Sequence, residues 1–265
     1  MSKINSAIRE IQSIDNMASS NQWLNNVHPL VKLFLTIIYI GIVVSFDKYD
    51  ITGLAAMFVY PFIVFNIGDI SFKDALHRLR VVLPVVCIVG IFNPFFDTQI
   101  VMTIGGLGIR AGVISMVTLM LKGIFTVLAS YLLIATTTIE KICYSMTLLH
   151  LPKIFVTEIM LIYRYITLLL SEAHKMTQAY ALRAPGQKGV AYKVWGSMIG
   201  QLLLRSVDRA DNVYEAMNLR GYQGDYYCEK MGFKISDGVY LVIWLGIFIV
   251  FRVFPVLPLI GNLFV

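Results

Sequence analysis

Five long runs of apolar residues, free of charged side chains apart from one lysine, constrain this chain most. They cover residues 33–46, 51–68, 81–96, 111–139 and 238–251. A helix needs about 20 residues to cross the hydrocarbon core of a bilayer, with about 17–25 as the working range. The runs therefore predict an all-α, polytopic membrane protein with about five transmembrane helices.

The composition agrees with this prediction. Hydrophobic residues make up 57% of the chain and charged residues 14%, and the mean hydropathy is +0.72. A soluble domain has about 25% charged residues, so this chain has too few charges to cover a soluble surface. Its three cysteines are widely separated and lack CxxC spacing, which favours packing roles over a disulfide framework or a zinc site.

The positions of lysine and arginine predict the orientation. With a cytoplasmic N-terminus and five alternating spans, only Lys48, Arg110 and Arg252 of the 22 Lys and Arg fall in outer loops, and Lys122 lies inside a span. Cytoplasmic loops of membrane proteins carry an excess of Lys and Arg. We therefore expect a multi-pass protein of the cell membrane, with its N-terminus and residues 140–234 in the cytoplasm.

Three parts follow one another along the chain. Residues 1–139 should hold a polar, interfacial N-terminal segment and four transmembrane helices, residues 140–235 a cytoplasmic region, and residues 236–265 a C-terminal transmembrane segment. Lys32 lies near the start of the first run, where a long side chain can snorkel to the interface. Lys122 either snorkels from deep in the bilayer or faces protein.

The cytoplasmic region predicts two long helices. Pro152 suits a helix start and Pro185 cannot continue a helix, so the first should cover about 152–185. The second should cover about 190–220, because Gly221 suits the left-handed position that ends many helices. One face of the second helix carries a stripe at spacings of three and four: Trp195, Ile199, Leu202, Ser206, Ala210, Val213 and Met217. At 1.5 Å per residue this helix is about 47 Å long, so it must pack along a partner.

Each of these helices ends on an arginine whose neighbours cannot mask its charge. The two ends are Leu182, Arg183 and Ala184 in the first helix, and Leu219, Arg220 and Gly221 in the second. A cation at a helix C-terminus complements the macrodipole by about 0.3–1 kcal/mol, which is sufficient reason for either arginine alone. The pair suggests two prongs, each binding a carboxylate or carbonyl of another protein.

These residues resemble the transmembrane T component of energy-coupling factor (ECF) transporters, the EcfT/CbiQ family. The match is most specific from residue 151 to the glycine after Pro185 and over EAMNLRGY, and is looser at HPLVKL, residues 28–33. The family's x-Arg-x motifs carry over onto Leu182–Arg183–Ala184 and Leu219–Arg220–Gly221, although leucine stands where the family often has alanine.

The resemblance implies a non-catalytic subunit with no cofactor of its own. Its partners would be two ABC-type ATPases, each docked on one arginine-bearing helix end, and a membrane-embedded substrate-binding S component. Crossed helices would slide over small and medium residues of the second helix, such as Gly196, Gly200, Ser206, Ala210 and Ala216. The opening residues resemble the dedicated CbiQ type, associated with cobalt or nickel uptake, and a shared T component serving vitamin-binding S components stays open.

Other function classes fit less well. A conventional ABC permease would dock through a short loop helix, and a membrane-embedded hydrolase would need a nucleophile with its base or an HExxH pair. Glu172 and His174 come closest, but residues two apart point to different faces of a helix. The four histidines are dispersed, so no metal site is expected, and residues 140–234 carry 12 basic against 8 acidic residues, too small an excess to predict nucleic-acid binding. Gly105–Gly108 should form an outer turn and not a P-loop.

Overall fold

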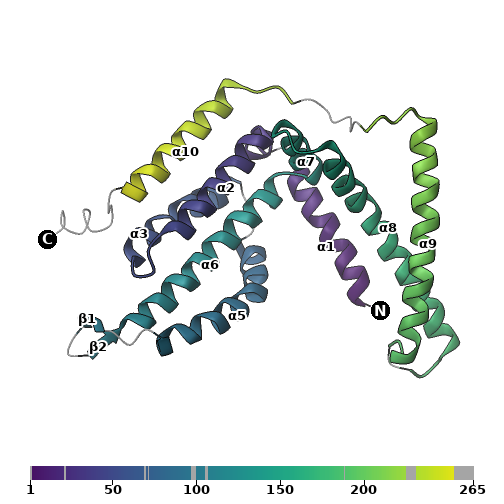
Figure 1. Cartoon of the computed structure of the whole chain (residues 1–265), viewed down its shortest axis with the longest axis horizontal. Helices are drawn as coiled ribbons and strands as arrows, with labels where there is room; N and C mark the ends of the chain where they lie inside the picture. The colour runs from purple at the N-terminus through teal and green to yellow at the C-terminus, as the bar shows by residue number, and fades with distance from the viewer. Residues whose placement is uncertain are drawn as a thin grey trace. The chain divides into compact units, whose positions relative to one another are not determined.

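The computed structural model describes residues 2–20, 22–68, 70, 72–96, 100–104, 107–187, 189–224 and 231–253. Helices account for most of these residues (Figure 1). The chain divides into two compact units. Unit 1 comprises Met1–Met17 and Ile139–Lys230, and unit 2 comprises Ala18–Thr138 and Met231–Val265.

Unit 2 is a bundle built around one long helix, α6. Its helices are α2 (Pro29–Ser45), α3 (Ile51–Ala56), α4 (Val59–Ile67), α5 (Phe72–Phe96), α6 (Ala111–Thr136) and α10 (Ile235–Val253), preceded by the 3-10 helix Leu24–Asn26. Helix α6 packs against α2, α3, α4 and α5, and α10 packs against α2 and α3. The last described helix of the chain therefore closes onto the first helix of the bundle.

An aromatic cluster joins α2, α4 and α10 at the centre of this bundle. Tyr39, Tyr60, Trp244 and Phe248 pack with ring centroids 4.8 to 5.9 Å apart. All four side chains are buried. Aromatic pairs at such distances add about 0.5–1.5 kcal/mol beyond the area that they bury. This cluster fixes α10 to residues about two hundred positions earlier in the sequence.

The second apolar run forms two helices and not the single helix that we expected. Helix α3 ends at Ala56 and α4 begins at Val59. Proline clashes with the carbonyl four residues earlier, so Pro61 prevents the helix from continuing through Met57. The Met57 carbonyl instead accepts a hydrogen bond from the Tyr39 hydroxyl at 3.0 Å. The interruption between α3 and α4 thus provides a backbone acceptor for the Tyr39 hydroxyl of the aromatic cluster.

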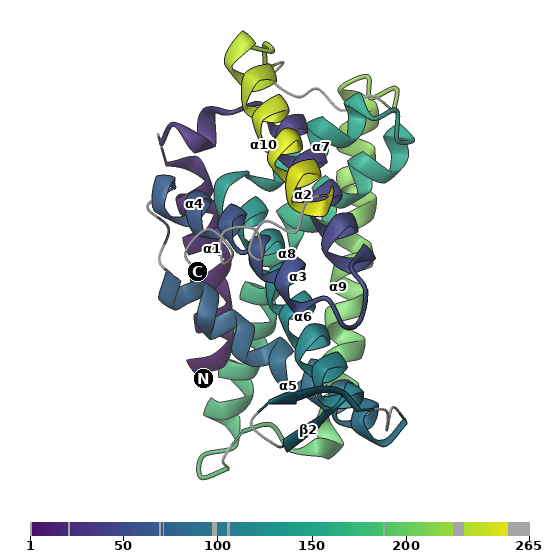
Figure 2. The same ribbon diagram turned by 90° about the vertical axis from the view of Figure 1, so that its left-hand side faces the viewer.

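Two short strands interrupt the helical pattern. Strand β1 (Ile100–Ile104) pairs antiparallel with β2 (Leu107–Arg110), and Ile104 lies opposite Leu107. This hairpin agrees with a turn near Gly105–Gly108, although residues 105–106 themselves lie outside the described residues. The strands contact α6 and lie at the end where that helix begins (Figure 1 and Figure 2). The hairpin is a small addition to an all-α architecture.

Membrane-spanning character is confirmed by helix length and composition. Among the described residues, three helices are long and apolar enough to cross a membrane: Ala111–Thr136, Lys153–Arg183 and Ile235–Val253. Shorter apolar helical stretches are Pro29–Ser45, Ile51–Ile67 and Val82–Phe92. The chain is an all-α polytopic membrane protein. Lys153–Arg183 is the first of the two helices that we expected in the cytoplasm, and it qualifies because its first half is apolar nearly all round.

Cations from two other helices cap the C-terminal end of α2. Lys122 donates from Nζ to the carbonyl oxygens of Val44, at 3.0 Å, and Phe46. Arg252 donates to the Ser45 carbonyl at 3.0 Å and lies over the Phe46 ring. The last carbonyls of a helix have no partner within the helix and carry partial negative charge, which favours cations there. Of the two roles considered for Lys122, the structure shows that it faces protein.

Unit 1 contains the two long helices predicted between the apolar runs. Its helices are most of α1 (Ser2–Ser19), α7 (Ile139–Leu148), α8 (Lys153–Arg183) and α9 (Tyr192–Leu219). The bounds of α8 and α9 agree with the predicted 152–185 and 190–220 to within two residues. Helix α7 packs on α8 through a small core of Cys143, Val156 and Met160.

Candidate functional site: the α8 and α9 helix pair

Helices α8 and α9 form an antiparallel pair held by two polar contacts. The Tyr222 hydroxyl, just beyond α9, donates to Thr157 Oγ1 near the start of α8 at 3.2 Å. Arg205 of α9 forms an ion pair with Glu172 of α8, to which Lys175 also lies within 3.9 Å. Because the end of α9 lies at the start of α8, the two helices run in opposite directions.

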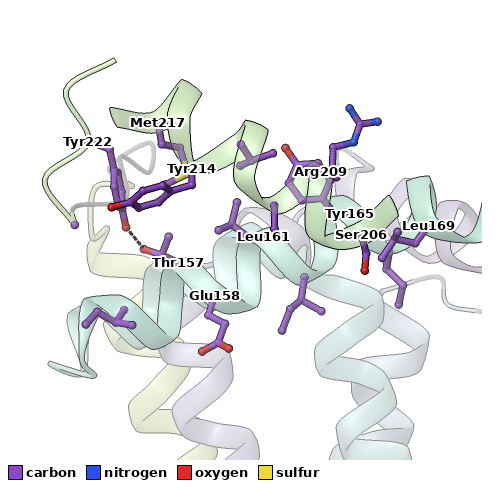
Figure 3. Close-up of a pocket in the computed structure, with 16 residues that line it drawn as sticks. Thr157, Glu158, Leu161, Tyr165, Leu169, Ser206, Arg209, Tyr214, Met217 and Tyr222 are labelled. Carbon is purple, nitrogen blue, oxygen red and sulfur yellow. Dashed lines mark hydrogen bonds between the residues drawn. The ribbon is translucent and has the colours of Figure 1, made fainter. Parts of the chain in front are cut away.

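A wide apolar groove of about 780 Å³ lies between the two helices. Helix α8 supplies mainly large apolar side chains, with Thr157 and Glu158 at one end. From α9, the groove is lined by four members of the predicted stripe: Ser206, Ala210, Val213 and Met217. Figure 3 shows Tyr214 and Tyr222 near Thr157 at one end of this groove. The second half of the stripe therefore faces α8, as a helix that packs along a partner requires.

The first half of the stripe differs. Trp195 and Ile199 are exposed large hydrophobic residues. A Cβ atom added to Gly196 or Gly200 would meet no described atom within 4 Å. Gly196 and Gly200 therefore make no close helix contact among the described residues, whereas Ser206 and Ala210 line the groove against α8, and the expected sliding of the helices stays a prediction.

The whole of α9 is short of intramolecular packing. All 28 of its residues are described, and none is buried. Besides Trp195 and Ile199, exposed large apolar residues on α9 include Tyr192, Leu203, Leu204, Val207, Tyr214 and Leu219. Large exposed apolar patches usually mark contacts with another protein or with a membrane. Helix α9 therefore has the surface of a docking element.

The first predicted arginine motif lies at the end of α8. The Ala184 N–H donates to the Tyr180 carbonyl at 3.0 Å and closes the last turn. The Tyr180 hydroxyl donates to Gln187 Oε1 at 2.6 Å, which fastens the following turn to the helix. Leu182 is 84% exposed, and the Arg183 side chain is exposed beside it. The helix end is thus ordered while its arginine faces outward.

The second motif ends α9 in a Schellman turn. The Gly221 N–H donates to the Asn218 carbonyl at 2.9 Å and the Tyr222 N–H to the Met217 carbonyl at 3.0 Å, the paired pattern of that motif. Gly221 has a φ of 74°, in the left-handed region that favours glycine. Leu219 is 89% exposed and Arg220 is exposed. Both motifs therefore present an arginine at an ordered helix end.

The two arginines mark opposite ends of the helix pair. Tyr222 lies at Thr157, and from there α8 continues for 26 residues to Arg183. At 1.5 Å per residue this rise is about 39 Å. The two guanidinium groups are therefore too far apart to enter one compact pocket on another protein.

The contacts that hold the pair were missed from sequence. Glu172 was considered beside His174 as a hydrolase pair, but it pairs with Arg205, whereas His174 Nε2 lies 3.0 Å from Gln178 Nε2. In an antiparallel helix pair, the sequence positions of two facing residues have a nearly constant sum. This holds here for Thr157 with Tyr222 and for Glu172 with Arg205. Opposite charges that satisfy this rule are the signal that could have found the ion pair.

Metal-ligating side chains do not gather in the described part of the chain. No group of three or more His, Cys, Asp or Glu residues could hold an ion there. His28 instead caps α2, since its Nδ1 accepts from the Leu30 N–H at 3.3 Å. Cys143 is buried and Cys87 half-buried, neither of these two described cysteines forms a disulfide, and Cys228 lies outside the described residues.

Comparison with known proteins identifies the family. Residues 20–231 match the model of CbiQ, described as a cobalt transport protein. The chain belongs to the CbiQ family. The match includes both arginine motifs of this CbiQ-family protein and the HPLVKL segment, so the family inferred from those residues is confirmed. An uncharacterized protein of Methanocaldococcus jannaschii is 27% identical over 233 residues, which cover 83% of this chain and 78% of the relative.

Proposed function

We propose that this chain is the T component of an ECF-type importer, which couples a pair of ABC-type ATPases to a membrane-embedded S component. Helices α8 and α9 would be the coupling helices, within a cytoplasmic region of residues 140–235. Cobalt ions are the proposed substrate, in line with the description of the family, and nickel ions are the alternative. The observation that carries the proposal is the pair of exposed arginines at opposite ends of one helix pair.

Each arginine end has the properties of an anchor for an ATPase. A guanidinium group offers several fixed donors and forms bidentate contacts with carboxylates. The exposed leucine before each arginine adds apolar area to the same tip. A separation of about 39 Å suits one contact on each of two ATPase subunits. Leu182–Arg183–Ala184 and Leu219–Arg220–Gly221 are therefore proposed to dock on separate subunits.

Motion would pass from the ATPases through the helix pair. When the two ATPases close on ATP, the bound tips must move relative to one another. The contact of Tyr222 with Thr157 holds the pair together at one end, so this motion changes the angle between α8 and α9. The apolar groove and the exposed face of α9 would transmit the change to the S component. The chain itself takes part in no bond breaking in this scheme, because ATP hydrolysis belongs to the partners.

The assignment of the tips can be tested with Arg183→Ala, Arg220→Ala and the double variant, produced together with the ATPases and the S component. Truncation of a hot-spot residue weakens binding by about 2 kcal/mol or more, which is about 30-fold, and arginine is enriched at hot spots. We expect each single variant to retain less ATPase on co-purification, and the double variant to lose cobalt uptake. Arg164→Ala is the matched control, since Arg164 is an exposed arginine in the middle of α8. Normal ATPase retention and uptake in the double variant would refute the proposal.

Subunit counting separates this function from that of a conventional ABC permease. Native mass measurement of the purified complex should give one copy of this chain for each pair of ATPases. Two copies for each pair would favour the permease. Uptake of a vitamin in place of cobalt or nickel ions would leave the coupling role intact and assign the chain to the shared type of T component.

A further inference from the structure

The chain passes between its two units three times. The crossings follow Met17, Thr138 and Lys230. On the unit 2 side, one residue near each crossing matters here: Leu24 after the first, Thr136 before the second and Lys234 after the third. Leu24 and Thr136 are hydrogen-bonded to Lys32. Lys234 is hydrogen-bonded to Asp237, which also binds His28. His28 and Lys32 both belong to one short stretch at the start of α2.

Lys32 holds the segments of the first two crossings. Its side chain is buried, with only 6% exposed. Its Nζ donates to the Thr136 carbonyl at 2.7 Å and to the Leu24 carbonyl at 3.2 Å. Thr136 is the last residue of α6, two positions before the second crossing. The expectation that Lys32 snorkels to the membrane interface is therefore wrong, because backbone carbonyls inside unit 2 bind its ammonium group.

Asp237 holds the segment of the third crossing. It is 2% exposed, and its Oδ2 accepts from the Lys234 N–H at 2.9 Å. Its Oδ1 accepts from the His28 N–H at 3.3 Å. The Phe233 ring packs against the His28 ring, with centroids 5.6 Å apart. One carboxylate thus joins the N-terminal ends of α10 and α2 just after the chain re-enters unit 2.

A stiff attachment at these places has a mechanical meaning. A connecting segment that moved freely on unit 2 would absorb any displacement that reached it from unit 1. Hydrogen bonds to charged groups are stronger than those between neutral groups, and buried ones restrain their partners more firmly than exposed ones. The two charged side chains lie at the ends of helices next to the crossings, where a restraint acts on the connection itself.

We propose that Lys32 and Asp237 are positioning residues for coupling: they fix the three connecting segments to the start of α2, so that motion of unit 1 displaces the bundle of unit 2. This proposal rests on the coupling function proposed above. It gives the HPLVKL segment a role, since His28 and Lys32 both belong to it. It also predicts that weakening this anchor separates ATP hydrolysis from transport.

The first test uses Lys32→Met and Asp237→Asn in the full complex, reconstituted in lipid vesicles, with radioactive cobalt ions as the probe. ATP hydrolysis and cobalt uptake are measured on the same vesicles. We expect assembly and hydrolysis to persist while uptake per ATP hydrolysed falls about tenfold, which is in the range of measured coupling between sites. Lys48→Met is the matched control because Lys48 is exposed on the same unit.

The second measurement needs neither partners nor transport. Amide hydrogen exchange in the purified chain should become about tenfold faster in segments 22–27 and 134–138 of Lys32→Met, and in segment 231–236 of Asp237→Asn, with the aromatic cluster still protected. Exchange that stays unchanged at these segments overturns the proposal whatever the transport result. The proposal is also overturned if uptake does not fall, or if uptake and hydrolysis fall in proportion. Failure of both variants to fold overturns it as well, because the two residues would then serve stability alone. A wild-type complex that takes up no cobalt, vitamin or nickel contradicts the proposed function, and the exchange result still decides the anchor.

Discussion

The Tyr222 hydroxyl bonds Thr157 Oγ1 at 3.2 Å across 65 residues of sequence, directly behind the turn that carries Arg220. The Arg220 end of α9 is therefore fastened to the start of α8. The Arg183 end lies about 39 Å away, at the other end of α8. A force applied at Arg183 acts beyond the Glu172–Arg205 ion pair and far from the Tyr222 contact, whereas a force at Arg220 acts beside that contact.

Tyr222→Phe should loosen this fastening without disturbing either helix. The variant removes one hydrogen bond, worth about 1 kcal/mol, and keeps the ring that lines the groove. We expect a broader distribution of distances between spin labels placed at the two facing helix ends, measured by pulsed electron paramagnetic resonance. Tyr214→Phe on α9 is the control, because Tyr214 is largely exposed. Equal distributions in the two variants would show that the hydroxyl does not restrain the pair.

Gly221 and Gly196 should respond in opposite ways to alanine. Both have open space for a Cβ atom among the described residues, so only backbone conformation separates them. Gly221 has a positive φ, where an L-residue loses about 1–2 kcal/mol, whereas alanine within a helix gains about 0.5–1 kcal/mol over glycine. We expect Gly221→Ala to lower the thermal stability of the purified chain and Gly196→Ala to raise it. Shifts of the same sign would contradict the left-handed turn at the end of α9.

Lys122→Met should destabilise unit 2. It removes the ammonium donor of the Val44 and Phe46 carbonyls. The bond to Val44 is exposed, so most of the cost comes from the part-buried bond to Phe46, and a hydrogen bond to a charged group contributes about 1.5–3 kcal/mol. We expect a lower midpoint of thermal unfolding in detergent. Lys193→Met serves as the comparison, since Lys193 is exposed on α9. A lysine that merely snorkelled to the interface would give no loss, because methionine would then be the more favourable residue in lipid.

The orientation can be tested with single cysteines in a background without the three natural ones. Leu219→Cys lies at the exposed end of α9, and Tyr49→Cys lies in the predicted outer loop. We expect a maleimide that cannot cross membranes to label Tyr49→Cys in whole cells and Leu219→Cys only after permeabilisation. The reverse pattern would place the arginine tips outside the cell and contradict the coupling role.

Local signals in the sequence accounted for much of the helical structure. Pro152, Pro185 and Gly221 give the ends of α8 and α9 to within two residues because each acts on the backbone at its own position. The apolar runs indicated the bundle helices for a similar reason, since every stretch of helix in lipid must be apolar on its own. The break at Met57 was equally local, and Pro61 is the residue that should have indicated it.

Contacts to backbone atoms were out of reach of the sequence. Lys32 is buried because two carbonyls, at Leu24 and Thr136, come together around it. Every residue has such a carbonyl, so no pattern of side chains marks which ones a lysine will meet. The antiparallel pairing of α8 and α9 was hidden for a related reason: periodicity indicates which face is apolar and does not indicate what covers it.

The lack of any buried residue along α9 has a consequence for the life of the protein in the cell. Most helices in proteins owe their persistence to packing and not to intrinsic propensity. A copy made without its partner proteins would expose the leucine, tyrosine and tryptophan side chains of α9 to quality-control proteases. Turnover of the orphan chain should therefore outpace that of the assembled one, so that proteolysis adjusts its abundance to that of its complex.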